Sequence, residues 1–383
     1  MDKLYYLDNA ATTKVFDEEF DIIKSQNQTG FYNPSAANKW SLEVKKSFNK
    51  ARLNITKVLG GENGKLIFTS SATESNNSVF EGLHLRKSQE VLISVGEHPA
   101  VYYAAHRLEN KGIIVKDIPL GVNGECDFEK FKEMMNPNVA LVSIMHVSNE
   151  TGAINDIKKF CTYAKQVNPK VLFHSDGVQA FCKIKVNMKE LGVDLYTISA
   201  HKVYAPRGIA GLWIKKGVVI EPFLIGGGQE EGFRSSTENV AGALAFDYAV
   251  SKLKDDFDSN TLKVANIRNN IIEGLQNSEI DYCFKVNSND NNSPYILSVS
   301  FDKIKGEVLM NMLESYGIII STGSACSAKK AGNRILESMG LTDSQVVGSV
   351  RISFSAYEEY DTHYVINSIV ECVKKLQSNN IRK

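Results

Sequence analysis

Residues 194–202 read DLYTISAHK, an apolar run typical of a buried strand that leads into a His-Lys pair. A lysine at such a strand end can be held out of bulk water, and desolvation lowers the pKa of an amine from its usual value of about 10.4. Lys202 is therefore a candidate Schiff-base nucleophile. The alternative is a surface lysine beside a loop histidine, and the neighbouring segments bear on this choice.

The segment upstream, residues 171–179, reads VLFHSDGVQ and predicts a second buried strand that ends at Asp176. In an open α/β sheet, ligands lie outside the carboxyl ends of the strands, so we expect Asp176 and Lys202 to face one crevice. A carboxylate there can keep a pyridinium nitrogen protonated, which makes the ring of pyridoxal phosphate an electron sink. Asp176 alone could equally be a helix N-cap.

A third segment could bind the phosphate of such a cofactor. Residues 66–77 read LIFTSSATESNN and predict a strand, a turn of small residues and the start of a helix. The backbone N–H groups and the positive end of the helix dipole favour an anion there, and Thr73 would add a hydroxyl. The alternative is an ordinary Ser/Thr cap without a ligand.

Two further strands are predicted to end in polar residues. Residues 91–100 read VLISVGEHPA, so His98 follows a strand and could stack on a flat ring and move protons. Residues 140–150 read ALVSIMHVSNE and predict a buried strand that ends in Asn149, whose amide could bind a phenolic oxygen. Helical and extended segments alternate from about Lys65 to Ile214, which predicts an α/β fold with a mainly parallel sheet covered on both faces.

These motifs occur in an order that resembles one family, the class V aminotransferases of the fold-type I pyridoxal phosphate enzymes. The residues in question are Ala72, Thr73, His98, Asn149, Asp176, Gln179, Ser199, His201 and Lys202. Two more motifs, YLDNAATT at 6–13 and GSAC at 323–326, narrow the resemblance to the NifS/IscS-like cysteine desulfurases, over about Tyr6 to Ser355. The resemblance implies a large cofactor-binding domain at 14–258, built on a seven-stranded sheet, and a smaller α+β domain at 1–13 and 259–383.

The resemblance also implies a role for each site residue. Lys202 would hold the cofactor aldehyde, Asp176 would pair with the pyridinium nitrogen, and His98 would stack on the ring. The expected phosphate ligands are Ala72, Thr73, Ser199, His201 and, reaching the neighbouring subunit's site in a homodimer, Thr237. Gln179 and Asn149 would contact the ring oxygen and the substrate side. Asn149 and Arg351, within SVRIS at 349–353, would bind the substrate carboxylate, a task that suits the planar fork of arginine.

One thiol separates a desulfurase from an aminotransferase. The chain has six cysteines without CxxC or zinc-like spacing, namely Cys126, Cys161, Cys182, Cys283, Cys326 and Cys372. Only Cys326 lies in a run of small, glycine-containing residues, 321–332, which predicts a mobile loop. We expect Cys326 to take the sulfur of L-cysteine as a persulfide, leaving L-alanine, and to pass it to an acceptor protein for iron-sulfur cluster assembly or tRNA thiolation. Cys326 is also a candidate transient cluster ligand, and no other metal site is expected.

Composition excludes several other classes. The 383 residues include 44 basic and 44 acidic side chains, so no overall field favours direct nucleic-acid binding. We expect no membrane span or leader, and a cytoplasmic protein with reduced thiols. The glycine-rich segment 226–232 lacks a P-loop ending and predicts a turn that presents residues 234–237 at the dimer interface. The polar segment 287–294 predicts a solvated loop without a function.

Departures from the family pattern leave the acceptor and the exact activity open. Ser71 stands where many relatives carry glycine, and the loop after Cys326 is somewhat shorter than in the housekeeping bacterial enzymes. Relatives that load the iron-sulfur scaffold also have a longer tail after the final helical segment, which ends here at about Leu376. The acceptor could therefore be a different one. The protein could also be a selenocysteine lyase, an aminotransferase or a non-enzymatic regulatory relative, and the intact site residues disfavour the regulatory role.

Overall fold

A seven-stranded sheet forms the centre of the larger part of the molecule. The computed structural model describes residues 4–289, 291–322 and 329–381, so Cys326 lies outside the described residues. The strands run in the order β2-β8-β7-β6-β5-β3-β4, and every neighbouring pair is parallel except those that β8 makes with β2 and β7. Their bounds are β2 Gly64–Thr69, β3 Glu90–Ser94, β4 Ile114–Ile118, β5 Val139–Ser143, β6 Leu172–Asp176, β7 Leu195–Ser199 and β8 Ala210–Lys215.

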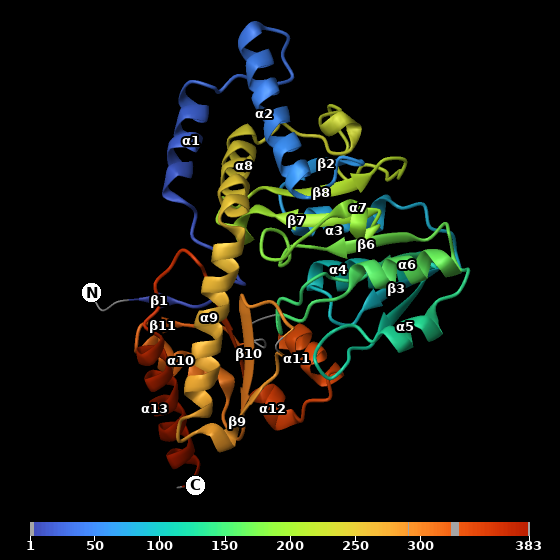
Figure 1. Ribbon diagram of the computed structural model, residues 1–383. Helices are drawn as coiled ribbons and strands as arrows, with labels where there is room; N and C mark the ends of the chain where they lie inside the picture. Colours follow the sequence, from blue (N-terminus) through green and yellow to red (C-terminus); the bar gives the residue numbers. More distant parts are fainter. Residues whose placement is uncertain (1–3, 290, 323–328, 382–383) are drawn as a thin grey trace.

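Successive residues of each strand face opposite sides of the sheet, and the strands carry apolar residues on both sides. Helices therefore cover both faces. In β3, Val91 and Ile93 pack in one apolar cluster with Phe80, whereas Leu92 packs in another with Phe160. The first cluster draws on α3 Ala72–Gly82, α4 Pro99–His106 and the 3-10 turn η1 Arg107–Lys111. The second draws on α2 Lys39–Val58, α5 Phe128–Met134, α6 Ile157–Val167, α7 Met188–Leu191 and α8 Val240–Asp255. Helix α1, Asp17–Gln28, packs on α8 (Figure 1).

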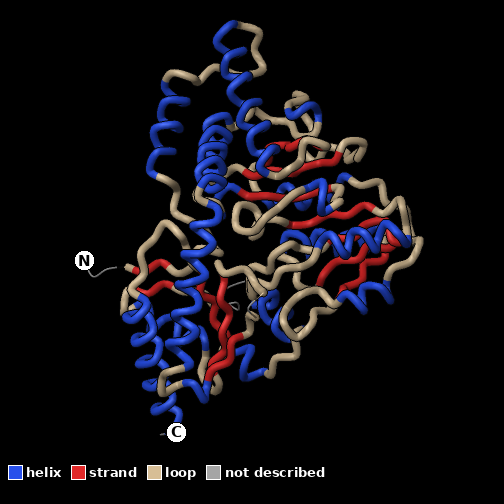
Figure 2. The backbone as a smooth tube through the Cα atoms, viewed as in Figure 1, coloured by secondary structure: helices blue, strands red, loops and turns tan. Residues whose placement is uncertain are grey.

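A second part of the molecule has its own sheets and its own apolar cluster. Three antiparallel strands run in the order β12-β10-β9, and β1 pairs in parallel with β11. Figure 2 shows these strands in red, apart from the strands of the larger sheet. The strands are β1 Tyr5–Tyr6, β9 Phe284–Val286, β10 Ile296–Phe301, β11 Ile318–Ile319 and β12 Ser349–Ser353. The helices are α9 Phe257–Gln276, α10 Gly306–Glu314, α11 Lys329–Ser338, α12 Asp343–Val347 and α13 Thr362–Ile381. We propose that the two parts are the expected domains, 14–258 and the remainder.

The expected fold class is confirmed: the sheet is mainly parallel and has helices on both faces. One strand prediction was too long, because β5 ends at Ser143 and the chain then turns, so Asn149 lies in a loop. The segment 287–294 is not the solvated loop that its composition suggests, since Asn287, Ser288, Asn292 and Ser293 are all buried. Within the described residues, no helix is both long and apolar enough to span a membrane.

Candidate active site

A cavity of about 310 Å³ opens at the carboxyl ends of the central strands. It lies where the topology rule for open α/β sheets places a ligand. Most of the predicted site residues line it: Ala72, Thr73, His98, Asn149, Asp176, Gln179, His201, Lys202 and Arg351. These side chains come from the ends of β2, β3, β5, β6 and β7 or from the segments that follow them, and Arg351 comes from β12. The cavity therefore combines residues from both parts of the molecule.

Lys202 ends the 3-10 turn η2, Ala200–Lys202, directly after β7. Its Nζ donates to the carbonyl oxygens of Ala10 at 2.6 Å and of Ala11 at 2.5 Å. Burial, reinforced by the positive charge of Arg351, lowers the pKa of this amine to about 8. A substantial fraction of Lys202 is consequently uncharged at mildly alkaline pH, as a nucleophilic or proton-accepting amine requires.

Asp176 is the last residue of β6 and is only 5% exposed. Its Oδ2 accepts from Asn76 Nδ2 at 2.9 Å, and its Oδ1 accepts from the backbone N–H of Val178 at 3.0 Å. These two donors fix the carboxylate at the wall of the cavity. It can therefore pair with a protonated ring nitrogen without a change of rotamer.

Helix α3 begins at the cavity, where its first turn presents backbone N–H groups. Ser71 is the N-cap, and its Oγ accepts from Glu74 N at 3.1 Å. Ala72 and Thr73 follow, and the amides of a first turn have no acceptor within their own helix. An anion in the cavity can accept from these groups and gains from the helix dipole. Ser71 thus caps the helix whose first turn faces the cavity.

His98 is the N-cap of α4, and its Nδ1 accepts from the backbone N–H of Ala100 at 3.1 Å. Partial desolvation lowers the pKa of the ring, although the Asp176 carboxylate opposes this shift. An accepting Nδ1 in a neutral ring leaves the proton on Nε2. His201, next to Lys202, also has a lowered pKa, about 4, chiefly because of burial, and its Nδ1 lies 3.2 Å from Thr12 Oγ1.

Arg351 is 7% exposed and lies between two carboxylates. Its Nη2 contacts Asp8 Oδ1 at 2.9 Å, and its Nη1 contacts Glu150 Oε1 at 3.3 Å and donates to Asn149 O at 2.9 Å. Burial disfavours its charge, but Glu150 and Asp8 together raise its pKa above the ordinary value. Its Nε and Asn149 Oδ1 are buried without a hydrogen-bond partner in the described part of the chain. Unpaired polar atoms in a cavity wall are suited to a polar ligand.

Two predicted residues do not line this cavity. Ser199 is buried at the end of β7. Thr237 lines a different cavity of about 150 Å³ together with Glu230 and Arg234. Cys326 falls in the stretch 323–328, outside the described residues.

Described residues on either side of residues 323–328 contact elements that carry cavity residues. Ser321, just before it, exchanges two backbone hydrogen bonds with Arg351, at 2.7 and 3.1 Å. Beyond it, Arg334 in α11 donates to the carbonyl oxygens of Val95 and Glu97, both at 2.8 Å, in the turn that leads to His98.

The other five cysteines are buried and none of them forms a disulfide with another. Burial raises the pKa of each thiol, to about 11 for Cys161 and Cys372. A thiol is a nucleophile only as thiolate, so these five are poorly reactive. The residues that the structure describes contain no group of histidine, cysteine and acidic side chains that could hold a metal ion.

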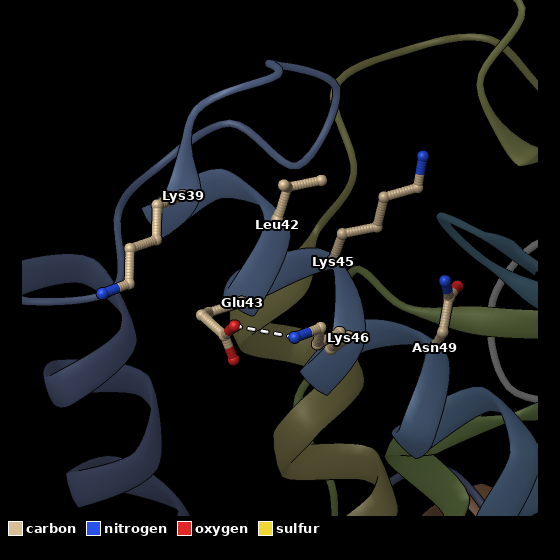
Figure 3. Close-up of a pocket in the computed structure, with 6 residues that line it drawn as sticks. All are labelled: Lys39, Leu42, Glu43, Lys45, Lys46 and Asn49. Atoms are coloured by element: carbon tan, nitrogen blue, oxygen red, sulfur yellow. Dashed lines mark hydrogen bonds and ion pairs between the residues drawn. The ribbon is translucent and has the colours of Figure 1, made fainter.

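A surface depression on α2 offers a contrast (Figure 3). It is lined by Lys39, Leu42, Glu43, Lys45, Lys46 and Asn49. Lys46 pairs with Glu43 at 2.8 Å, and the lining residues are solvated side chains of one helix. No predicted site residue belongs to it, and we assign it no function.

Sequence reasoning missed Asp8, Asn76 and Glu150, which contact predicted site residues directly. Asp8 lies in the motif at 6–13, which carried the resemblance but not a role. Asn76 is one turn along α3 from Ala72, so helical spacing was the available signal. Glu150 is adjacent to Asn149, and nothing in the sequence marks it as a partner of Arg351.

Comparisons with known proteins identify the family. The family model for aminotransferase class-V matches residues 5–362. The cysteine desulfurase IscS of Dictyoglomus turgidum is 32% identical over 383 residues, covering 99% of this chain and 96% of the relative. A solved structure of a NifS-like protein superimposes with a TM-score of 0.88 at 30% identity over all of both chains. A structure of SspA in complex with cysteine has a TM-score of 0.79 at 27% identity, covering 93% of this chain and 100% of that one.

The predicted resemblance is thus confirmed over nearly the whole chain: the protein belongs to the class-V aminotransferase family and, within it, to the NifS/IscS-like cysteine desulfurases.

Proposed function

We propose that the protein is a pyridoxal phosphate-dependent cysteine desulfurase that converts L-cysteine to L-alanine and leaves the sulfur on Cys326 as a persulfide. The observation that carries this proposal is the cavity in which Lys202, Asp176, His98 and Arg351 meet. The similarity of this chain to relatives named cysteine desulfurase IscS supports the same conclusion.

The cavity residues fit pyridoxal phosphate. The first turn of α3 supplies N–H donors for the phosphate, and the fixed carboxylate of Asp176 suits a pyridinium nitrogen. Lys202, with its lowered pKa, is the amine that would hold the aldehyde. When bound, this cofactor supplies an electron sink for bonds broken at the substrate Cα.

Two groups of the chain can move protons at the substrate. The Lys202 amine, with a pKa of about 8, can accept a proton from Cα and return it within the physiological range. His98 carries its proton on Nε2 and can hand it on from there. Proton transfer by two residues at one cavity is sufficient for removal and replacement of a Cα proton.

Arg351 and Asn149 would orient the substrate through its carboxylate. The unpaired Arg351 Nε offers a donor, and the neighbouring Asp8 and Glu150 hold the guanidinium in place. The Arg351 guanidinium is withdrawn from solvent, which strengthens a charged hydrogen bond. This contact fixes the substrate Cα relative to Lys202.

Cys326 would act as the sulfur acceptor. Its thiolate attacks the substrate sulfur, an S–S bond forms, and the C–S bond breaks with its electron pair left on carbon, which is then protonated to give L-alanine. The step needs no external oxidant, because the thiol of Cys326 becomes a persulfide as the substrate carbon is reduced. The raised pKa values of the other five thiols make them poor alternatives.

We further propose a homodimer in which Thr237 reaches the phosphate in the partner's site, and an acceptor protein that takes the persulfide for iron-sulfur assembly or tRNA thiolation. A cytoplasmic location accords with five buried cysteines that form no disulfide among themselves.

The test measures sulfide and alanine released from L-cysteine under reductant by the cofactor-loaded protein and its Cys326→Ala and Cys161→Ala variants. We expect equal amounts of both products from the parent and from Cys161→Ala, and neither product from Cys326→Ala. Alanine and sulfide formed at the parental rate by Cys326→Ala would refute the role of Cys326. Absence of both products from a loaded parent would refute the desulfurase assignment.

A further inference from the structure

A buried lysine outside the proposed mechanism, Lys183, lies next to the candidate site. It is 6% exposed, and its Nζ donates to Gln179 Oε1 at 2.9 Å. No carboxylate in the described ranges pairs with it, and the charges that act on it come from Lys202, Arg351 and Cys182. Burial and these two cations lower the pKa of Lys183 to about 7. A lysine that is costly to bury and has no acidic partner calls for a functional explanation.

The contacts of Gln179 fix which way its amide points. Its Nε2 donates to the carbonyl oxygen of Ala10 at 2.9 Å. A backbone carbonyl can only accept, so this contact favours an amide oxygen that faces the other way, toward Lys183. The Lys183 amine can donate to that oxygen whether or not it is protonated. Both neighbours therefore favour the same orientation.

This orientation determines what Gln179 offers to the cavity. An amide nitrogen carries two N–H bonds, of which Ala10 O takes one, and Gln179 lines the cavity. Ala10 O also accepts from Lys202 Nζ at 2.6 Å, so one chain of contacts joins Lys183 through Gln179 and Ala10 to Lys202. If the amide were reversed, an acceptor oxygen would replace the N–H donor.

We propose that Lys183 is a positioning residue that holds the Gln179 amide with its N–H groups toward Ala10 and the cavity, so that Gln179 donates to the ring oxygen of the cofactor. The inference rests on the proposed function, because it requires pyridoxal phosphate in this cavity. A donor at the ring oxygen favours the negative charge there. Loss of the donor should therefore raise the pH midpoint at which the bound cofactor's visible absorption band changes.

The experiment compares five loaded proteins: the parent, Lys183→Met, Gln179→Leu, the double variant, and Lys185→Met. Lys185 is an exposed lysine on the same segment and serves as the matched control. For Lys183→Met we expect a midpoint higher by about 0.5 pH unit or more and cofactor affinity weaker by about fivefold, the size of one lost hydrogen bond. Lys185→Met should match the parent in both. The double variant should have the midpoint of Gln179→Leu alone, because Lys183 acts only through Gln179.

If Lys183→Met has the same pH midpoint as the parent, even with a weaker affinity for the cofactor, the inference is overturned and Lys183 has a packing role only. Additive shifts in the double variant would also overturn it. Lys183→Gln keeps an uncharged N–H donor and should restore a midpoint near that of the parent, whereas a shift equal to that of Lys183→Met would count against donor-based positioning. Lys183→Leu takes the place of Lys183→Met if the latter does not fold. A parent that binds no cofactor would overturn the proposed function itself, and the inference with it.

Discussion

Replacing the site lysine should make the cofactor-free protein more stable at neutral pH. Lys202 has a pKa of about 8 in the folded protein against an ordinary value of 10.5. Between these values the unfolded chain binds more protons than the folded chain, so the contribution of this group to stability rises with pH. Below pH 8 the folded protein bears the full free-energy cost of a charged, buried Lys202, and above pH 10.5 this cost vanishes. Lys202→Met removes the cost at every pH.

The two pKa values give the size of the effect. Charged Lys202 costs the folded protein about 3 kcal/mol at pH 7 and about 1 kcal/mol at pH 9.5. The variant also loses the hydrogen bonds to Ala10 and Ala11, roughly 1 kcal/mol each, at both pH values. The stability of Lys202→Met relative to the parent should therefore fall by about 2 kcal/mol between pH 7 and pH 9.5.

Urea unfolding of the cofactor-free proteins at the two pH values measures this difference. Lys216→Met, which removes an exposed lysine, is the control and should track the parent at both. A difference between Lys202→Met and the parent that does not change with pH would refute the reasoning. It would mean that the folded protein does not perturb the Lys202 amine.

Three further predictions concern other residues. Arg351→Lys should raise KM for L-cysteine by about tenfold or more with a smaller change in kcat, because the point charge of an ammonium replaces the planar guanidinium. An unchanged KM in steady-state kinetics would contradict a contact between Arg351 and the substrate carboxylate. His98→Gln should lower kcat by about 100-fold, measured as alanine formation, and a loss below threefold would argue against proton transfer by His98. Glu19 is fully buried, both its carboxyl oxygens lack a partner in the described chain, and burial raises its pKa to about 8. The unfolded chain releases this proton from about pH 4.5 upward, so the parent loses stability as the pH rises toward 8. The free energy of unfolding of Glu19→Gln, relative to the parent, should therefore increase by about 4 kcal/mol between pH 5 and pH 9 in urea unfolding. A difference that stays constant with pH would contradict the prediction.

Strands and the residues at their ends were predictable because local pattern determines them. The apolar runs that predicted β6 and β7 lie in the sheet, and the residues that follow, Asp176 and Lys202, line one cavity. The same reasoning made β5 too long, because Ile144, Met145 and Val147 continue the apolar run beyond Ser143, where the strand ends. A buried loop and a buried strand look alike in sequence.

Contacts between distant residues could not be predicted in this way. Asp8 meets Arg351 across 343 positions, and no local pattern predicts that pair. The polar segment 287–294 misled for a related reason: Ser288 and Asn292 are buried because their side chains donate to Thr151 O, at 2.6 and 3.2 Å. Buried polar side chains are common where hydrogen bonds satisfy them, so composition alone does not imply exposure.

The pairing of the N-terminal segment has a consequence for the order of assembly. Leu7 O accepts from Ser353 N at 2.7 Å, and Ala10 N donates to Ser353 Oγ at 2.8 Å, so residues synthesised early are held by a strand synthesised 343 positions later. Those early residues supply the carbonyl oxygens that Lys202 and Gln179 use. A nascent chain can complete the seven-stranded sheet while β12 is still unmade, but residues 7–10 then lack the strand that pairs with them, and the cavity lacks Arg351. Catalytic competence should thus be acquired only after β12 has left the ribosome, which keeps partly synthesised chains from capturing the cofactor productively.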